Sequence, residues 1–240
     1  MATIYLIHGG WHGGWSWDLV RPLLEAAGHT VISPTLAGLA ERANLLTRET
    51  DLDTHLAEMG ELVAADTSDT VTLVGHSYGG MIITGVADRL PGKVANLIYL
   101  DGFVPKDTQS VFDVLPSSRR DYLQRLADTG GKKWMVPSPP PESFGVTDPE
   151  VADWARGLLT PQPLASLKQK IRLTGEGASV SRTYVHCNQG ALIASFAPFA
   201  ARYRDDPAWE VVEIASGHDA MLIEPNLVAD HIIGVVDEVE

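Results

Sequence analysis

The stretch VTLVGHSYGG at residues 71–80 joins an apolar run, a Gly-x-Ser-x-Gly motif and one further glycine. The apolar residues before the motif predict a buried strand, Thr70–Val74, and those after it predict a helix, Met81–Leu90. A strand, this motif and a helix in that order are typical of a nucleophile elbow, whose sharp turn needs small flanking residues. We therefore expect Ser77 to be a nucleophile at the positive end of a helix and not part of a plain glycine-rich turn.

Short β-branched runs alternate with longer helical stretches on both sides of this motif, as in a parallel sheet with crossover helices. The other expected strands are Thr3–Ile7, Thr30–Ser33, Ala95–Leu100, Arg182–Cys187 and Glu210–Ile214. Further helices are expected from Ser16, as the N-cap, to Gly28, from Thr50 toward Asp66, and over Asn226–Val239. The chain is thus predicted to be an α/β protein with a mostly parallel sheet of about six strands.

The regular alternation stops between Pro105 and Ser181, where prolines at 137, 139, 140, 141, 161 and 163 surround short amphipathic pieces such as Arg119–Ala127. Proline removes a backbone donor and breaks helices and central strands, so this stretch is not expected in the sheet. It is also long for a plain loop. We predict a core formed by 1–104 and 182–240, with 105–181 inserted as a small helical cap.

Composition disfavours two classes of partner. The chain has 240 residues and a net charge of −13, which disfavours nucleic acid and anionic lipid surfaces because both need clustered Lys and Arg. The N-terminus lacks the features of a signal peptide, and no apolar run is long enough for a membrane span. The single cysteine, Cys187, is expected to be an inert buried thiol, and its being alone favours a cytoplasmic location.

Backbone donors for a developing oxyanion are expected in two places. The segment HGGWHGGW at residues 8–15 follows the first strand, and a loop of this kind leaves amides exposed. With the residue after the nucleophile as the usual second donor, we assign the amides of Gly10 and Tyr78. His8 and His12 suggest a metal, but no carboxylate or cysteine adjoins them in sequence, so a structural role is favoured.

His218 is the expected general base, because it follows the last strand and precedes the last helix, where chain order places the base of this motif. The other histidines at 29, 55, 186 and 231 are expected in helices or strands away from the rim of the sheet.

The carboxylate that should orient His218 is not at its commonest position. The loop after Arg182–Cys187 is its commonest place, yet no Asp or Glu occurs from Thr183 to Arg204. Asp101 ends the preceding strand, close enough to reach the same histidine, and a carboxylate closing an apolar strand needs a partner. We assign Asp101 as the acid, the alternative being that it caps the following turn. Asp219 adjoins the base and is expected to point elsewhere.

Two groups of motifs together resemble the plant methylesterase and hydroxynitrile lyase family of α/β-hydrolases. They are HGGWHGGWSWD at 8–18 with PLLEAAGHTV at 22–31, and GHSYGG at 75–80 with GHDAMLIEP at 217–225. The resemblance covers residues 4–105 and 182–240 and is weak in the cap. It implies a cofactor-free Ser-His-Asp triad and small or aromatic esters as substrates.

Two departures from that family matter. The family usually carries its acid in the loop after the strand matching Arg182–Cys187, where this chain has none, whereas some haloalkane dehalogenases carry it where Asp101 stands. The lyases have a lysine after the catalytic histidine and a threonine in the oxyanion loop, where this chain has Asp219 and Gly10.

The expected function is therefore ester hydrolysis with a small-molecule partner and neither metal nor cofactor. The alternatives are lyase-type C–C cleavage and a weakly catalytic small-ligand receptor. Whether the chain forms a homodimer is left open.

Overall fold

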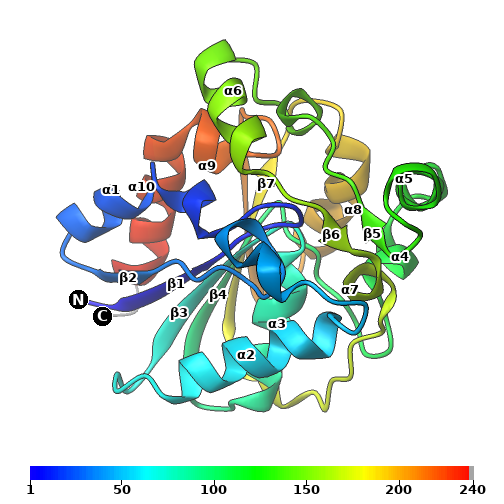
Figure 1. Ribbon diagram of the computed structural model, residues 1–240. Helices are drawn as coiled ribbons and strands as arrows, with labels where there is room; N and C mark the ends of the chain where they lie inside the picture. Colours follow the sequence, from blue (N-terminus) through cyan, green and yellow to red (C-terminus); the bar gives the residue numbers. More distant parts are fainter. Residues whose placement is uncertain (238–240) are drawn as a thin grey trace.

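The computed structural model describes residues 1–237 (Figure 1). At its centre is a sheet with the order β2-β1-β3-β4-β7-β8, in which every neighbouring pair of strands is parallel. The strands are β1 (Thr3–Ile7), β2 (Thr30–Ile32), β3 (Val71–His76), β4 (Val94–Leu100), β7 (Ser181–Cys187) and β8 (Trp209–Ile214). The predicted parallel sheet is confirmed, with strand ends close to those read from the sequence.

Side chains of the central strands are buried on both faces of the sheet. In β1, Ile4 and Leu6 pack into one hydrophobic core, whereas Tyr5 and Ile7 pack into the core on the opposite face. Successive residues of a strand point to opposite faces, so burial of all four requires a layer of helices on each side. This explains why the strands are apolar runs rather than alternating apolar and polar residues.

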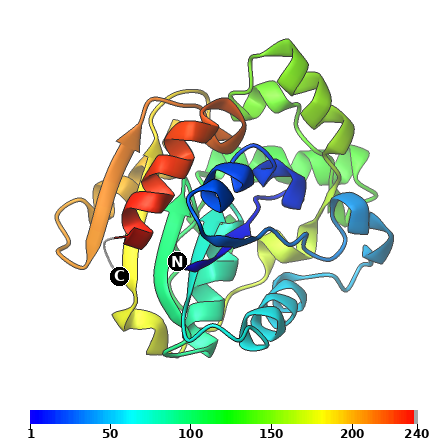
Figure 2. The same cartoon turned by 90° about the vertical axis from the view of Figure 1, so that its left-hand side faces the viewer.

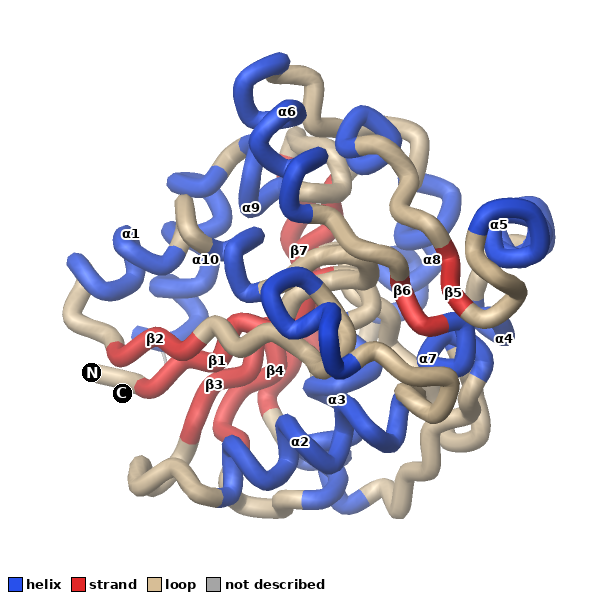
Figure 3. The backbone as a smooth tube through the Cα atoms, in the orientation of Figure 1, coloured by secondary structure: helices blue, strands red, loops and turns tan. Residues whose placement is uncertain are grey.

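Helices provide both layers (Figures 1 and 2). One core includes residues of α1 (Arg21–Ala26), α9 (Ala220–Ile223) and α10 (Pro225–Asp237). The other includes residues of α2 (Leu52–Ala64), α3 (Gly79–Arg89) and α8 (Ile193–Tyr203). Two 3₁₀ helices, η1 (Gly14–Trp17) and η2 (Ala40–Leu45), lie in the loops after β1 and β2. Figure 3 shows the red strands of the main sheet between these blue helices.

Two predicted helix starts are wrong. The helix expected from Ser16 is divided into η1 and α1, and the Ser16 hydroxyl donates to the Gly13 carbonyl instead of capping. Proline suits the first turn of a helix, and the structure begins α1 beside Pro22. The N-cap of α2 is Asp51, one residue after the expected Thr50, because its carboxylate accepts from the Thr54 amide. The last helix is described to Asp237, and the predicted end at Val239 lies outside the described residues.

The segment between β4 and β7 contains its own small elements. They are α4 (Val111–Val114), α5 (Ser117–Gly130), β5 (Met135–Val136), η3 (Pro141–Phe144), α6 (Pro149–Leu158), β6 (Gln162–Pro163), α7 (Leu164–Lys168) and η4 (Glu176–Ser179). The strands β5 and β6 pair only with each other, apart from the main sheet. The domain boundaries proposed from the sequence stay a prediction. No helix in residues 1–237 has the length and apolar character needed to cross a bilayer.

Candidate active site

Ser77 occupies a strained turn between β3 and α3. Its φ is 51°, in the left-handed region that residues other than glycine rarely adopt. A Cβ on Gly75 would lie 2.7 Å from the Gly79 carbonyl oxygen, and one on Gly79 would overlap the Ile7 carbonyl oxygen. Both glycines are therefore required for the close approach of strand and helix. This geometry is that of a nucleophile elbow.

The amides assigned to an oxyanion hole lie beside this turn. Gly10, Ser77 and Tyr78 line the same cavity. Within the described residues neither the Gly10 nor the Tyr78 amide donates a hydrogen bond to a protein acceptor, whereas the next amide, Trp11, donates to Gln162 Oε1 at 3.0 Å. Two unengaged N–H groups beside the Ser77 turn are the arrangement that stabilisation of an oxyanion would need.

Asp101 and His218 are brought together although 117 residues separate them. The Nδ1 atom of His218 donates to Asp101 Oδ2 at 2.8 Å, and both side chains are buried. The other carboxylate oxygen accepts from the Cys187 amide at 3.1 Å and from His186 Nδ1 at 2.9 Å. Asp101 has a φ of 43°, directly after the end of β4. Its carboxylate thus bridges the loop after β8 and the end of β7.

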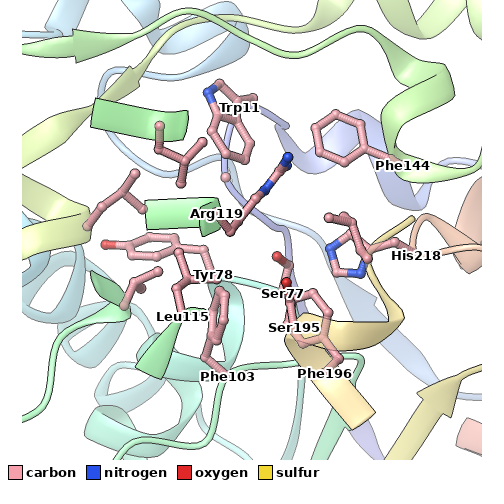
Figure 4. A pocket seen from close by; sticks show the side chains of 15 residues that line it. Trp11, Ser77, Tyr78, Phe103, Leu115, Arg119, Phe144, Ser195, Phe196 and His218 are labelled. Atoms are coloured by element: carbon pink, nitrogen blue, oxygen red, sulfur yellow. The ribbon is translucent and has the colours of Figure 1, made fainter. Parts of the chain in front are cut away.

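The cavity in front of Ser77 is narrow and apolar. His218 faces the same space as the Ser77 hydroxyl (Figure 4). The cavity volume is about 30 Å³, an order of magnitude below the roughly 300–1,000 Å³ of pockets for drug-sized ligands. Its lining includes Trp11, Phe103 and Phe144 among the aromatics weighed in the sequence, but neither Trp134 nor Trp154. Small substrates or some movement of the lining are therefore required.

His186 is a site residue that the sequence reasoning missed. The expectation that it lies away from the rim is wrong, because β7 places it at its carboxyl end, where it binds Asp101. The register of β4 and β7 pairs Leu100 with Val185, so His186 and Asp101 are the next residues along the two strands. A polar residue at the end of the strand beside Asp101 was the signal available in the sequence.

A second buried histidine–carboxylate pair involves Asp219. Asp219 binds His12 and not the adjacent His218, because its Oδ2 atom lies 3.0 Å from His12 Nε2. No carboxylate adjoins His12 in sequence, but the fold brings one to it from a position 207 residues away. Burial acts to lower the pKa of His12, but the Asp219 charge and hydrogen bonds to Asp219 and Gly10 raise it above its ordinary value. Since its Nδ1 donates to the Gly10 carbonyl at 2.7 Å, the pair also holds the loop that carries Gly10.

His76 lies between the two pairs. Burial, followed by the charges of nearby histidines, lowers its pKa well below the ordinary value, so its ring is neutral. Its Nε2 donates to the His218 carbonyl at 3.1 Å. His76, His218 and Asp219 bring potential metal ligands within 4.8 Å of one another. Because Asp101 engages His218 and His12 engages Asp219, we interpret the group as a hydrogen-bond network that holds the loops around Ser77.

Comparison with known proteins identifies the family. The model of the alpha/beta hydrolase family matches residues 4–231. The chain belongs to this family. The carbendazim hydrolyzing esterase of Nocardioides sp. (strain SG-4G) is 37% identical over 237 residues, covering 96% of this chain and 98% of that protein. Salicylic acid-binding protein 2 of Nicotiana tabacum is 32% identical over 242 residues, covering 92% of this chain and 91% of that protein.

The fold of this α/β hydrolase also occurs among solved structures. An extracellular alpha/beta-hydrolase from a Paenibacillus species superposes with a TM-score of 0.85, at 22% identity and over 98% of each chain. At this identity the likeness concerns the fold, which agrees with the parallel sheet and the turn at Ser77.

Proposed function

We propose that this α/β hydrolase cleaves carboxylic esters through an acyl-enzyme formed on Ser77. The observation that carries the proposal is the hydrogen bond of 2.8 Å from His218 Nδ1 to Asp101. It selects the tautomer in which Nε2 is free to act as a base, in a cavity shared with Ser77. The 37% identity to a full-length relative named as an esterase supports the same class of reaction.

In the proposed mechanism, Ser77 attacks the ester carbonyl while His218 takes its proton. Asp101 holds the imidazole and stabilises the imidazolium that forms. The Gly10 and Tyr78 amides donate hydrogen bonds to the carbonyl oxygen as it becomes negatively charged, and His218 then passes the proton to the leaving alcohol. Water repeats the sequence on the acyl-enzyme and regenerates the serine. None of these steps uses a metal or cofactor.

Lyase chemistry has less support. At the position of the lyase lysine this chain has Asp219, whose buried carboxylate binds His12. The positive charge of the lyases is therefore replaced by an acidic side chain that already has a partner. The narrow apolar cavity favours small acyl or aryl groups. A small-molecule ester as the partner and a cytoplasmic location, expected from the single cysteine, form part of the proposal.

Ser77→Ala tests the proposal. We expect the wild type to hydrolyse p-nitrophenyl acetate and butyrate and to react covalently with a fluorophosphonate probe. Both reactions should be lost in Ser77→Ala. Ser195→Ala is the matched control, because Ser195 is another serine of the same cavity and should not be required for labelling. Labelling that depends on Ser195 instead, or no ester turnover by the wild type, would contradict the proposal.

A further inference from the structure

Arg119 places a permanent positive charge in the cavity of Ser77. It belongs to the first turn of α5, and its side chain lies across the middle of the pocket residues in Figure 4. Most of the other side chains around it are apolar, including Leu115, Leu123 and Phe196. Burial lowers the pKa of Arg119, yet a guanidinium stays charged at neutral pH because its reference pKa is above about 12. The cavity is therefore apolar but locally cationic.

This charge has no counter-ion in the described part of the chain. The aromatic ring of Tyr122, on the same helix, lies 5.1 Å from the guanidinium carbon. Among the described residues, no carboxylate acts on the pKa of Arg119. The neighbouring Arg120, in contrast, lies 3.9 Å from Asp121. A guanidinium that is partly buried is incompletely hydrated, and an anion arriving with the substrate would supply acceptors for its N–H groups.

The depression next to the cavity has the same electrostatic character. An outer depression of about 320 Å³ shares Arg119, Leu192 and Ser195 with the inner cavity, so Arg119 lies at their junction. No aspartate or glutamate lines either hollow among the described residues. Pro116 and Ser118, at the start of α5, line the outer depression, and this helix start has neither a side-chain cap nor an acidic residue in its first turn. The partial positive charge of the helix start adds to that of Arg119.

We propose that Arg119 forms an anion subsite, and that the preferred substrates are esters carrying a free carboxylate a few bonds from the scissile carbonyl. This inference rests on the proposed ester hydrolysis at Ser77 and names its substrate class. Arginine presents two parallel N–H groups that match the two oxygens of a carboxylate, and the apolar surroundings strengthen that pairing. Half-esters of dicarboxylic acids have this chemistry: the ester carbonyl lies at Ser77 and the second carboxylate at Arg119.

The preference must arise from contact and not from long-range attraction. The chain carries a net charge of −13, so its overall field repels anions. A neutral ester of equal length enters the same cavity without that repulsion. A preference for the anionic ester therefore reports the contribution of the nearby guanidinium. Added salt should speed association of the anionic ester, because it screens the overall negative charge.

The test compares kcat/KM for pairs of p-nitrophenyl esters. Each pair contains a half-ester of succinate, glutarate or adipate and the neutral alkanoate of equal chain length. A second series places the carboxylate on the alcohol side, using alkyl esters followed by proton release. The proteins are the wild type, Arg119→Met, Arg119→Lys and the control Arg120→Met, whose side chain lines neither hollow. Binding of monomethyl glutarate and methyl valerate to Ser77→Ala, with and without Arg119→Met, is measured by calorimetry.

In at least one of the two series, the ratio of kcat/KM for the anionic ester to kcat/KM for the neutral ester should fall about 10–100-fold in Arg119→Met, as expected for loss of a hydrogen-bonded charge pair. Arg119→Lys should be intermediate, and Arg120→Met should match the wild type. The anion subsite is overturned if Arg119→Met leaves the ratio unchanged in both series and leaves ligand binding to Ser77→Ala unchanged. Turnover of the neutral esters in the same experiment would still uphold the proposed function. Carboxylate binding that requires Arg119 without any ester turnover would support the subsite and refute ester hydrolysis.

Discussion

Replacing Asp101 by asparagine changes the acid of the proposed triad but leaves a side chain of nearly the same shape in its place. Asparagine tolerates the left-handed backbone that Asp101 adopts, with a φ of 43°. The orientation of the new amide follows from the neighbouring donors. The Cys187 amide, 3.1 Å away, and His186 Nδ1, 2.9 Å away, both point to one oxygen of Asp101, so the amide oxygen must occupy that position. The NH₂ group then faces His218.

The size of the effect follows from this orientation. An NH₂ group in place of Oδ2, which lies 2.8 Å from His218 Nδ1, makes that nitrogen an acceptor. The ring proton then resides on Nε2, which can no longer take a proton from Ser77. Loss of the productive tautomer in a triad of this kind costs about 10⁴-fold in kcat, or about 5.4 kcal/mol at about 1.36 kcal/mol for each tenfold change.

The assay is the rate of p-nitrophenyl butyrate hydrolysis by the wild type, Asp101→Asn and Asp88→Asn. Asp88 is a suitable control because it is also a buried carboxylate, yet its partners are Thr174 and Gly175, away from the cavity. Asp88→Asn should stay near the wild-type rate, and the melting temperature of each variant checks that it folds. If Asp101→Asn retains more than about a tenth of wild-type kcat, the tautomer argument is refuted and the protein works as a Ser-His dyad.

Two further predictions concern stability. Burial lowers the pKa of His8 to about 3, so the folded protein keeps it neutral at pH 5 while the unfolded chain protonates it. The free energy of unfolding therefore falls as the pH drops below the unfolded-state pKa of about 6.5, and the loss due to His8 is about 2 kcal/mol at pH 5. His12, whose pKa is raised in the folded protein, makes the free energy of unfolding change in the opposite direction. Urea unfolding of the wild type and His8→Gln at about pH 7.5 and pH 5 checks this, and an equal pH dependence in both would contradict it. Gly80→Ala should lower stability by about 1–3 kcal/mol because its Cβ would overlap the Phe103 carbonyl oxygen. Gly60→Ala, in open space within α2, should instead stabilise by up to about 1 kcal/mol, and thermal melts that rank the two in the reverse order would refute the steric argument.

Much of the fold could be predicted because its signals are local. The apolar run before Ser77 and the helix after it interact within a few residues, and Gly75 and Gly79 are required by contacts inside that same turn or with the adjacent strand. Strand positions followed from short β-branched runs in the same way. Helix starts were less accurate, since the neighbouring residues Thr50 and Asp51 are both acceptable N-caps and only the hydrogen bond to Thr54 distinguishes them.

The separate candidates of the site could be identified from the sequence, but not all of their contacts could. Asp101 could be proposed because a carboxylate at the end of an apolar strand needs a partner, and the structure supplies His218. His186 was assigned elsewhere because its contact with Asp101 depends on the register of two strands 85 residues apart. The pairing of His12 with Asp219 has the same origin, since nothing near either residue in sequence indicates the other.

The sequence by itself determined the order of strands and helices, the turn at Ser77 and the position of His218 after the last strand. These depend on periodicity, on glycine where a Cβ would collide, and on the chain order of one motif. Only the tertiary structure decided that one carboxylate bridges His218 and His186, and that Arg119 projects from its amphipathic helix into the cavity. Such contacts depend on how strands align and how the segment between β4 and β7 packs over them. Packing of distant segments leaves no local pattern in the sequence, because each residue type suits many environments.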